Sequence, residues 1–303
     1  MVTELQRDVT EDEIRQYKED GVVHLRGILT QKWIEHLGPA IDKALYETGD
    51  SGLAIYDATE LADGLRAAGG TVLEDARAAA IEHPGRFISA IGTWTVVPEM
   101  RQFALESPLG YVAARLFGAN EVCFYDDQTL IKEPGSREYT AFHTDEPYYH
   151  LRGDQVCGIW VSPDTVSEDS GAMQYVRGSH RWGTFFKPNT FVGQSALSDL
   201  GLAEEDDEQV HLPDIEGNPD EYDIVTYPSE PGDVIVHHSN LIHGAGPNYT
   251  SDQRRRAVSL RYTGDDVRYH FHKSAPPQPH HRHALRDGDR IACEQFPRVW
   301  PRQ

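Results

Sequence analysis

Residues 231–246 read PGDVIVHHSNLIHGAG, and this stretch says more about the fold than any other part of the chain. It opens on the turn residues Pro-Gly, and the Val and Ile that follow are typical of a buried strand. It ends in Gly-Ala-Gly, whose small side chains leave open space beside His243. We therefore predict a buried β-strand, with His237 and His238 on opposite faces because neighbouring strand residues alternate.

Further short runs of the same composition begin at residue 121. Turn signals of the Pro-Gly and Asp-Ser-Gly type separate them. Many short strands joined by tight turns are typical of a sandwich or barrel, so we predict a mainly β core. The runs are EVCFYDDQTLIK (121–132), QVCGIWVS (155–162), AMQYV (172–176), DIVTY (223–227), DVIVHH (233–238) and AVSLRYTG (257–264).

The first third of the chain has the pattern of helices. Thr10 and Glu13 match a capping box, and Gly21 lies where a C-terminal cap belongs. A second helix with one apolar stripe is expected from Thr30, and a third between Pro108 and Gly118. We expect these helices to pack on the β core.

We expect one domain over residues 1–303. Its parts are a mainly helical layer (1–120), a β-barrel core (121–270) and a C-terminal tail (271–303). The acidic stretch 204–223 interrupts the strand series. It is expected to be a solvated surface insertion, because its carboxylates lack the spacing and the glycine of an EF-hand calcium loop.

Composition and charge exclude several classes of protein. With 39% hydrophobic residues, the 303-residue chain can bury a core, which excludes wholesale disorder. The formal net charge of −21 repels phosphate backbones and anionic lipid, so neither nucleic acid nor a membrane is an expected partner. No signal-peptide pattern, membrane-spanning run or cysteine framework is found. We expect a cytoplasmic protein; whether it is a monomer or a small homo-oligomer stays open.

Residue types that ligate metals occur within this β region. His143 and Asp145 are two apart, so both side chains can reach one metal ion from a strand end. Together with His243 they would form a face of two histidines and one carboxylate, the arrangement used by non-haem iron oxygenases. An arginine of the run Arg254-Arg255-Arg256 could bind the far carboxylate of a chelating keto acid through two parallel hydrogen bonds.

These motifs and their order resemble the phytanoyl-CoA dioxygenase (PhyH) family, within the Fe(II)/2-oxoglutarate-dependent oxygenases. The resemblance covers nearly the whole chain and rests on several stretches together. These are EDGVVHLRGIL, LIKEPG, FHTDEPYYHLRGDQVCGIW, DSGAMQYVRGSHRWG, PGDVIVHHSNLIHGAGPN, RRAVSLRYTGDD and FPRVWPR.

The resemblance implies a double-stranded β-helix, a cupin-like jelly-roll barrel with helices on its outside. It implies His143, Asp145 and His243 as ligands of Fe(II), with 2-oxoglutarate and O₂ as co-substrates. The implied reaction hydroxylates an unactivated C–H bond of a small-molecule metabolite and releases succinate and CO₂; desaturation or cyclisation stays open. Asp145 favours hydroxylation over halogenation, because the related halogenases lack this carboxylate.

The resemblance also implies where the co-substrate binds. Counting residues from His243 selects Arg254 as the partner of the distal carboxylate of 2-oxoglutarate, whereas the register of the strand selects Arg255. We expect Arg255, because turns absorb insertions more easily than strands do. Further residues expected at this site are Trp160, Gln128 and Lys132.

Three residues after the metal motif are candidates for the substrate pocket. Tyr148, Tyr149 and His150 either line that pocket or pack over the barrel mouth. The net charge of the chain disfavours a polyanionic CoA ester, so a small neutral or cationic metabolite is the expected substrate. A later histidine cluster follows a proline-rich stretch and is expected in a solvent-exposed or capping tail rather than in a second metal site. Its members are His280, His281 and His283.

Two other functions stay open at this point. The same three ligands suit zinc, and a metal-dependent hydrolase would need a base such as Glu146, although its position in the strand directs it away from the ligands. A non-catalytic, cupin-like binding protein is the other alternative. The strand that carries the arginines discriminates between these hypotheses, because a hydrolase has no need of it.

Overall fold

The fold is described from a computed structural model, which covers residues 4–48 and 53–301; both ends of the expected 1–303 domain lie outside these residues. The helices are α1 (Glu11–Asp20), α2 (Gln31–Tyr46), α3 (Ala58–Ala67), α4 (Ala76–Ala79), α5 (Pro98–Glu106) and α6 (Leu109–Phe117). The strands of the first half are β1 (Val22–Leu25), β2 (Ala54–Asp57), β3 (Phe87–Ile91), β4 (Val122–Lys132), β5 (Thr140–His143), β6 (Leu151–Arg152) and β7 (Val156–Val161). Those of the second half are β8 (Met173–Val176), β9 (Ile224–Tyr227), β10 (Val234–His238), β11 (His243–Ala245), β12 (Arg255–Thr263), β13 (Arg268–Tyr269) and β14 (Arg298–Trp300).

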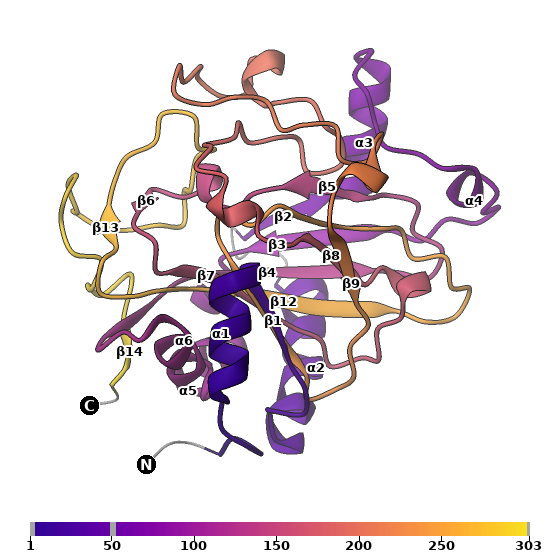
Figure 1. The fold of residues 1–303 in the computed structure, drawn as a ribbon. Coiled ribbons are helices and arrows are strands. Elements are labelled where there is room, and N and C mark those ends of the chain that lie inside the picture. The colour runs from indigo at the N-terminus through magenta and orange to yellow at the C-terminus, as the bar shows by residue number, and fades with distance from the viewer. Residues whose placement is uncertain (1–3, 49–52, 302–303) are drawn as a thin grey trace.

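Two antiparallel sheets form the centre of the described molecule. The large sheet has the order β1-β10-β7-β12-β4-β3-β2, and β14 also pairs with β4. The smaller sheet has the order β5-β11-β8-β9. The helices α1, α2, α5 and α6 lie on one side of the large sheet, and β5, β8 and β9 lie on its other side (Figure 1). This arrangement confirms the expected mainly β protein with flanking helices.

Alternation along β12 divides the interior into two layers. Val258, Leu260 and Tyr262 are buried against the helices, whereas Ala257 packs between the two sheets with residues such as Tyr175 of β8. Successive strand side chains point to opposite faces, so one strand serves both layers. The layer between the sheets is the one that contains the candidate site.

The helix ends follow the expected sequence signals. Both hydrogen bonds of the capping box between Thr10 and Glu13 are present, and Gly21 closes α1 in a left-handed conformation with φ of 77°. Gly118 ends α6 in the same way, with φ of 71°. Glycine is suited to both positions because it has no Cβ to clash at positive φ.

Three expectations about the strands need correction. The stretch 231–246 is two strands: β10 belongs to the large sheet and β11 to the smaller one. The mainly helical layer 1–120 also supplies β1, at one edge of the large sheet, and β2 and β3, which end the sheet on the other side. The tail 271–303 supplies β14, which pairs with β4. The periodicity of apolar residues does not identify such short runs as strands. They become strands by pairing with segments that lie far away in the sequence.

The acidic stretch 204–223 is the last part of the irregular connection between β8 and β9. Most of its residues are exposed, and Ile215 is fully buried. Across residues 4–48 and 53–301, no helix is long and apolar enough to cross a membrane. All three cysteines, Cys123, Cys157 and Cys293, are free.

Replacing Leu260 with Ala should destabilise the fold. This side chain is fully buried beneath the helices, and its loss leaves a cavity in addition to the lost transfer free energy. We expect the free energy of unfolding, measured by denaturant titration, to fall by about 2–5 kcal/mol. The matched control Leu202→Ala removes a side chain that is 59% exposed and should change it by less than about 0.5 kcal/mol. Equal effects of the two substitutions would contradict the burial described here.

Candidate active site

His143, Asp145 and His243 converge between the two sheets. His143 ends β5, His243 begins β11, and the antiparallel register of these strands sets the two histidines opposite one another. All three side chains are buried, and one ligand atom from each lies within 4.8 Å of the others. The structure therefore brings together the three residues that the sequence suggested as metal ligands.

The backbone fixes the orientation of both imidazoles. Nδ1 of His143 donates to the carbonyl of Ala141 at 2.8 Å, and Nδ1 of His243 donates to the carbonyl of Leu241 at 2.9 Å. Because a carbonyl can only accept, the proton is on Nδ1 and the lone pair of Nε2 remains available to a metal. Burial lowers the pKa of both His143 and His243 to about 4, so both rings are neutral at pH 7.

Asp145 is ionised and held in place by a third histidine. Nε2 of His237 lies 3.3 Å from Oδ2 of Asp145, and the Asp145 amide donates to the carbonyl of Ser239 at 2.8 Å. Burial raises the pKa of the Asp145 carboxyl, but the hydrogen bond from His237 and the charge of nearby Arg261 outweigh it and hold that pKa well below its usual range. Two neutral imidazoles and one ionised carboxylate fit a divalent iron ion.

His237 is a site residue that the sequence did not identify. Alternation along the strand predicted only that His237 and His238 face opposite ways. The structure turns His237 inward, where a Cβ at the neighbouring Gly158 would lie 2.4 Å from Nε2 of His237. A glycine paired across the sheet from a histidine was the signal that could have found it.

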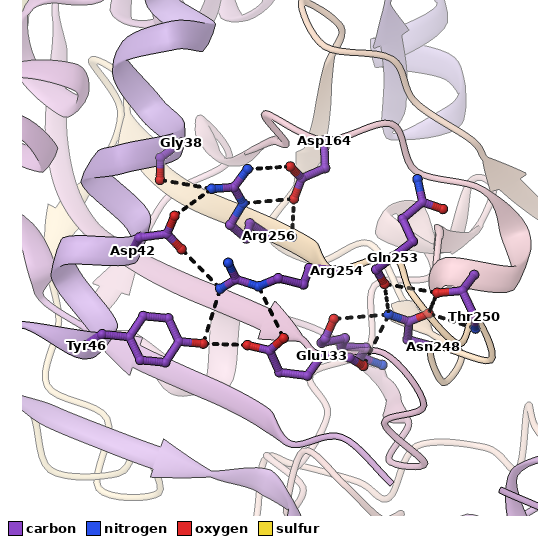
Figure 2. A network of polar contacts seen from close by, with 11 residues as sticks. Gly38, Asp42, Tyr46, Glu133, Asp164, Asn248, Thr250, Gln253, Arg254 and Arg256 are labelled. Carbon is purple, nitrogen blue, oxygen red and sulfur yellow. Dashed lines mark hydrogen bonds and ion pairs between the residues drawn. The ribbon is translucent and has the colours of Figure 1, made fainter. Parts of the chain in front are cut away.

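Arg254 and Arg256 face away from this interior. Their guanidinium groups meet carboxylates on the outer surface of the sheet: Arg254 contacts Asp42 at 3.1 Å and Glu133 at 3.2 Å, and Arg256 contacts Asp164 at 2.6 Å (Figure 2). Both arginines are therefore already paired with carboxylates.

Arg255, between them in the strand, points inward and is almost fully buried. Its Nε has no hydrogen-bond partner among the described residues. Its guanidinium carbon lies 5.8 Å from the ring centre of Trp160, and both residues line a small cavity together with His143, Asp145 and His243. Burial lowers the pKa of Arg255 to about 10, so it remains a cation at pH 7.

A larger cavity of about 240 Å³ adjoins the candidate site and is lined in part by His143 and Asp145. Tyr148 and Tyr149 line it, as the sequence suggested, and Gln128 lines both cavities. Arg261 also lines both, and it donates to the Tyr149 hydroxyl and to Gln128 Oε1, each at 2.7 Å. Sequence reasoning missed Arg261, although it lies six residues after Arg255 and therefore shares its face of β12.

Phe191 is a second missed residue of both cavities. Its ring centre lies 5.4 Å from that of His143. It adopts a left-handed backbone conformation with φ of 68°, which costs a bulky residue about 1–3 kcal/mol. Hydrogen bonds from the Ala141 amide to the Phe191 carbonyl and from the Phe191 amide to Asn189 Oδ1 hold it there.

Three other residues line neither of the two cavities. Lys132 is buried, and its Nζ donates to the carbonyls of Glu138 and Gly246 at 3.0 and 2.5 Å. His150 stacks on Phe271, with ring centres 5.0 Å apart. Glu146 follows Asp145 and is partly buried, and its carboxylate interacts with Asn240.

Two of the three tail histidines are mostly covered by protein. His280 and His281 contact the buried carboxylate of Asp126, at 2.7 and 3.2 Å. His283 is not part of that group. Of the two expectations for this segment, solvent-exposed or capping, the structure agrees with the capping one: the segment packs on β4 and, through residues 276–280, lines the larger cavity.

Comparison with known proteins identifies the family. A sequence model described as phytanoyl-CoA dioxygenase (PhyH) matches residues 17–257 of the chain. The chain belongs to the phytanoyl-CoA dioxygenase family. This membership confirms the expected enzyme class, an iron- and 2-oxoglutarate-dependent dioxygenase.

Curated relatives of this PhyH-family chain include further dioxygenases. Dioxygenase cdmD of Talaromyces verruculosus is 26% identical over 284 residues, which are 86% of this chain and 77% of the relative. A probable alpha-ketoglutarate-dependent hypophosphite dioxygenase of Stutzerimonas stutzeri is 29% identical over 137 residues, which are 45% of this chain and 43% of that protein.

Solved structures share the fold. The non-haem alpha-ketoglutarate-dependent carbocyclase SnoK from nogalamycin biosynthesis has a TM-score of 0.66 at 23% identity, covering 96% of this chain and 97% of its own. The epimerase SnoN, crystallised with Fe³⁺, alpha-ketoglutarate and nogalamycin RO, has a TM-score of 0.65 at 19% identity, covering 95% and 98%. These likenesses confirm the expected jelly-roll barrel, and the iron and keto acid in SnoN agree with the expected cofactors.

Replacing His237 with Ala should weaken metal binding without removing a ligand. The substitution deletes the N–H that holds Oδ2 of Asp145, and partners of this kind are worth about 10–100-fold in metal affinity. Anaerobic competition with an Fe(II) chelator measures the change. The matched control is His238→Ala, because that side chain lies on the opposite face beside Asp154. An equal loss in both variants would contradict the orienting role of His237.

Proposed function

We propose that this PhyH-family dioxygenase hydroxylates a C–H bond of a small-molecule metabolite, using Fe(II), 2-oxoglutarate and O₂ and releasing succinate and CO₂. In this proposal His143, Asp145 and His243 hold the iron. The observation that carries it is Arg255, a buried cation whose Nε has no partner in the described chain and which shares a cavity with these ligands. A buried charge without a partner is costly, so the site is built to receive an anion.

The keto acid would bind along the inward face of β12. Arg255 would pair with its distal carboxylate, since a guanidinium can donate two parallel hydrogen bonds to one carboxylate. The Trp160 ring forms one wall of this cavity, and Gln128 and Ser259 line it as well. Lys132 is not part of this proposal, because its Nζ already donates to two backbone carbonyls.

Iron held by His143, Asp145 and His243 would, with 2-oxoglutarate and O₂, supply the oxidising chemistry that acts on the substrate carbon. The task of the chain is to position one C–H bond beside the metal ligands and to keep other bonds and water away. Phe191 and Tyr148 are suited to this, because their rings lie edge-on to His143 at 5.4 and 5.9 Å. Asp145 occupies the carboxylate position, which supports hydroxylation over halogenation.

The larger cavity supports a compact substrate with a mostly apolar body. Apolar and aromatic side chains such as Ile91, Leu61 and Tyr149 line most of it. Its two carboxylates already have partners: Asp145 contacts His237, and Asp126 contacts His280 and His281. Arg261 is the cation on this wall. We therefore propose a neutral substrate, or one with an acceptor oxygen, and no longer a cationic one.

The alternative functions find less support. A hydrolase needs a base beside the metal-bound water, and Glu146 lines neither cavity and interacts with Asn240 instead. A binding protein that catalyses no reaction would not need a buried arginine whose Nε has no partner among the described residues beside a complete set of proposed metal ligands. No specific observation favours either function.

Replacing Arg255 with Ala should weaken 2-oxoglutarate binding while leaving iron bound. Truncating one partner of a buried charge pair costs about 2–5 kcal/mol, or at least ~30-fold in affinity. Anaerobic titration of the Fe(II)-loaded protein with 2-oxoglutarate, followed by the weak visible charge-transfer band of the chelate, measures the affinity. The native protein should give the band, and His143→Ala should abolish it.

The matched control is Arg254→Ala, the neighbouring residue whose guanidinium is paired with Asp42 and Glu133. It should titrate like the native protein. A band that is insensitive to Arg255→Ala but weakened by Arg254→Ala would overturn the assignment of Arg255. A folded, iron-loaded native protein that gives no band would overturn the proposed chemistry.

A further inference from the structure

We call residues 276–281 the strap; residues 276–280 of it form one wall of the larger cavity. Three prolines restrict the backbone of this segment before its histidines begin. Gln278 fixes it at two points: its Nε2 donates to the Tyr148 carbonyl at 2.6 Å, and its Oε1 accepts from the Tyr125 hydroxyl at 3.0 Å. The strap is therefore ordered by contacts that are separate from its histidines.

His280 and His281 of the strap converge on one carboxylate oxygen of β4. Their Nε2 atoms lie 2.7 and 3.2 Å from Oδ2 of Asp126. One ligand atom from each of the three residues lies within 4.8 Å of the others, as in the group formed by His143, Asp145 and His243. The two groups share no residue, although both have two histidines and one aspartate.

Contacts with neighbouring residues hold the three side chains in this arrangement. Oδ1 of Asp126 accepts from the Asp127 amide at 2.9 Å, which leaves Oδ2 directed at the histidines. The His281 ring lies edge-on to Tyr125 and Phe296, at 5.1 and 5.0 Å. The His280 ring occupies space that a side chain at Gly92 would fill, since a Cβ there would lie 2.7 Å from Cδ2 of His280.

We propose that Asp126, His280 and His281 form a second divalent-metal site, of the zinc type, that ties the strap to β4. Two imidazoles and one carboxylate form the ligand set of many three-residue zinc sites, which leave a further position for water. Among the described residues, the only side chains that hydrogen-bond to this buried carboxylate are the two imidazoles. A bound divalent ion would neutralise that charge with both rings neutral, and preorganised ligands lower the cost of binding it.

The proposed site borders the substrate cavity, because Asp126 and His280 also line it. An ion there would fix this wall of the cavity and would not replace the iron. The inference does not depend on the proposed reaction, since no residue of the iron group takes part in it.

The test counts tightly bound zinc in metal-free protein. Equilibrium dialysis against Zn²⁺, with free zinc held in the micromolar range by a competing chelator, is followed by elemental analysis of the protein. We expect two equivalents per native chain, because zinc also suits the group that contains His143. His143→Ala and His281→Ala should each lose one equivalent, and the double variant should lose both.

His283→Ala is the matched control, because His283 is a neighbouring tail histidine outside the group, and it should keep two equivalents. Asp126→Asn, which keeps the shape of the side chain, should bind one equivalent, and circular dichroism verifies that each variant is folded. One equivalent in the native chain, lost with His143→Ala and kept with His281→Ala, would overturn the second site and leave the iron group standing. Two equivalents retained in His281→Ala and Asp126→Asn would overturn the assignment to these residues.

Discussion

The register between β5 and β11 is the constraint on which the candidate site depends. It sets His143 opposite His243, and the Nδ1 of each ring donates to the carbonyl of the residue two positions earlier in the sequence. The orientation of both proposed ligands thus follows from backbone geometry alone. Asp145 joins them because its amide is bound by the carbonyl of Ser239, in the crossover between β10 and β11. A slip of one residue would turn one imidazole out of the interior.

The same two-residue period explains which arginine faces inward, and it shows the limit of such reasoning. Arg255 and Arg261 lie on one face of β12, whereas Arg256 and the preceding Arg254 point to the other side, as strand register predicts. Gln128 and Lys132 likewise share a face of β4, yet only Gln128 lines the cavities. Lys132 lies at the end of the strand, where its Nζ donates to two backbone carbonyls. Periodicity predicts the face of a strand but not the depth at which a cavity ends.

What the sequence left out depends on contacts between distant segments. The barrel, its flanking helices and the three proposed iron ligands could be predicted, because strand composition, caps and the family motifs are local. The inward turn of His237 requires a glycine on the neighbouring strand, Gly158. The contact of Asp126 with His280 joins residues 154 positions apart. A pattern within one segment carries no information about such a partner, so the sequence left open whether the tail histidines are exposed to solvent or cap the barrel.

The net charge of the whole chain likewise does not describe the charges inside the barrel. The chain has a formal net charge of −21, and that sum alone suggested a site that accepts neutral or cationic molecules. Inside the barrel, Arg255 and Arg261 are buried, while Asp145 and Asp126 are each held by histidines. Buried charges are screened far less than surface charges, so these few groups dominate the field that a bound molecule experiences. Surface charge acts on encounter, and the buried arginines favour acceptor oxygens once a molecule has entered.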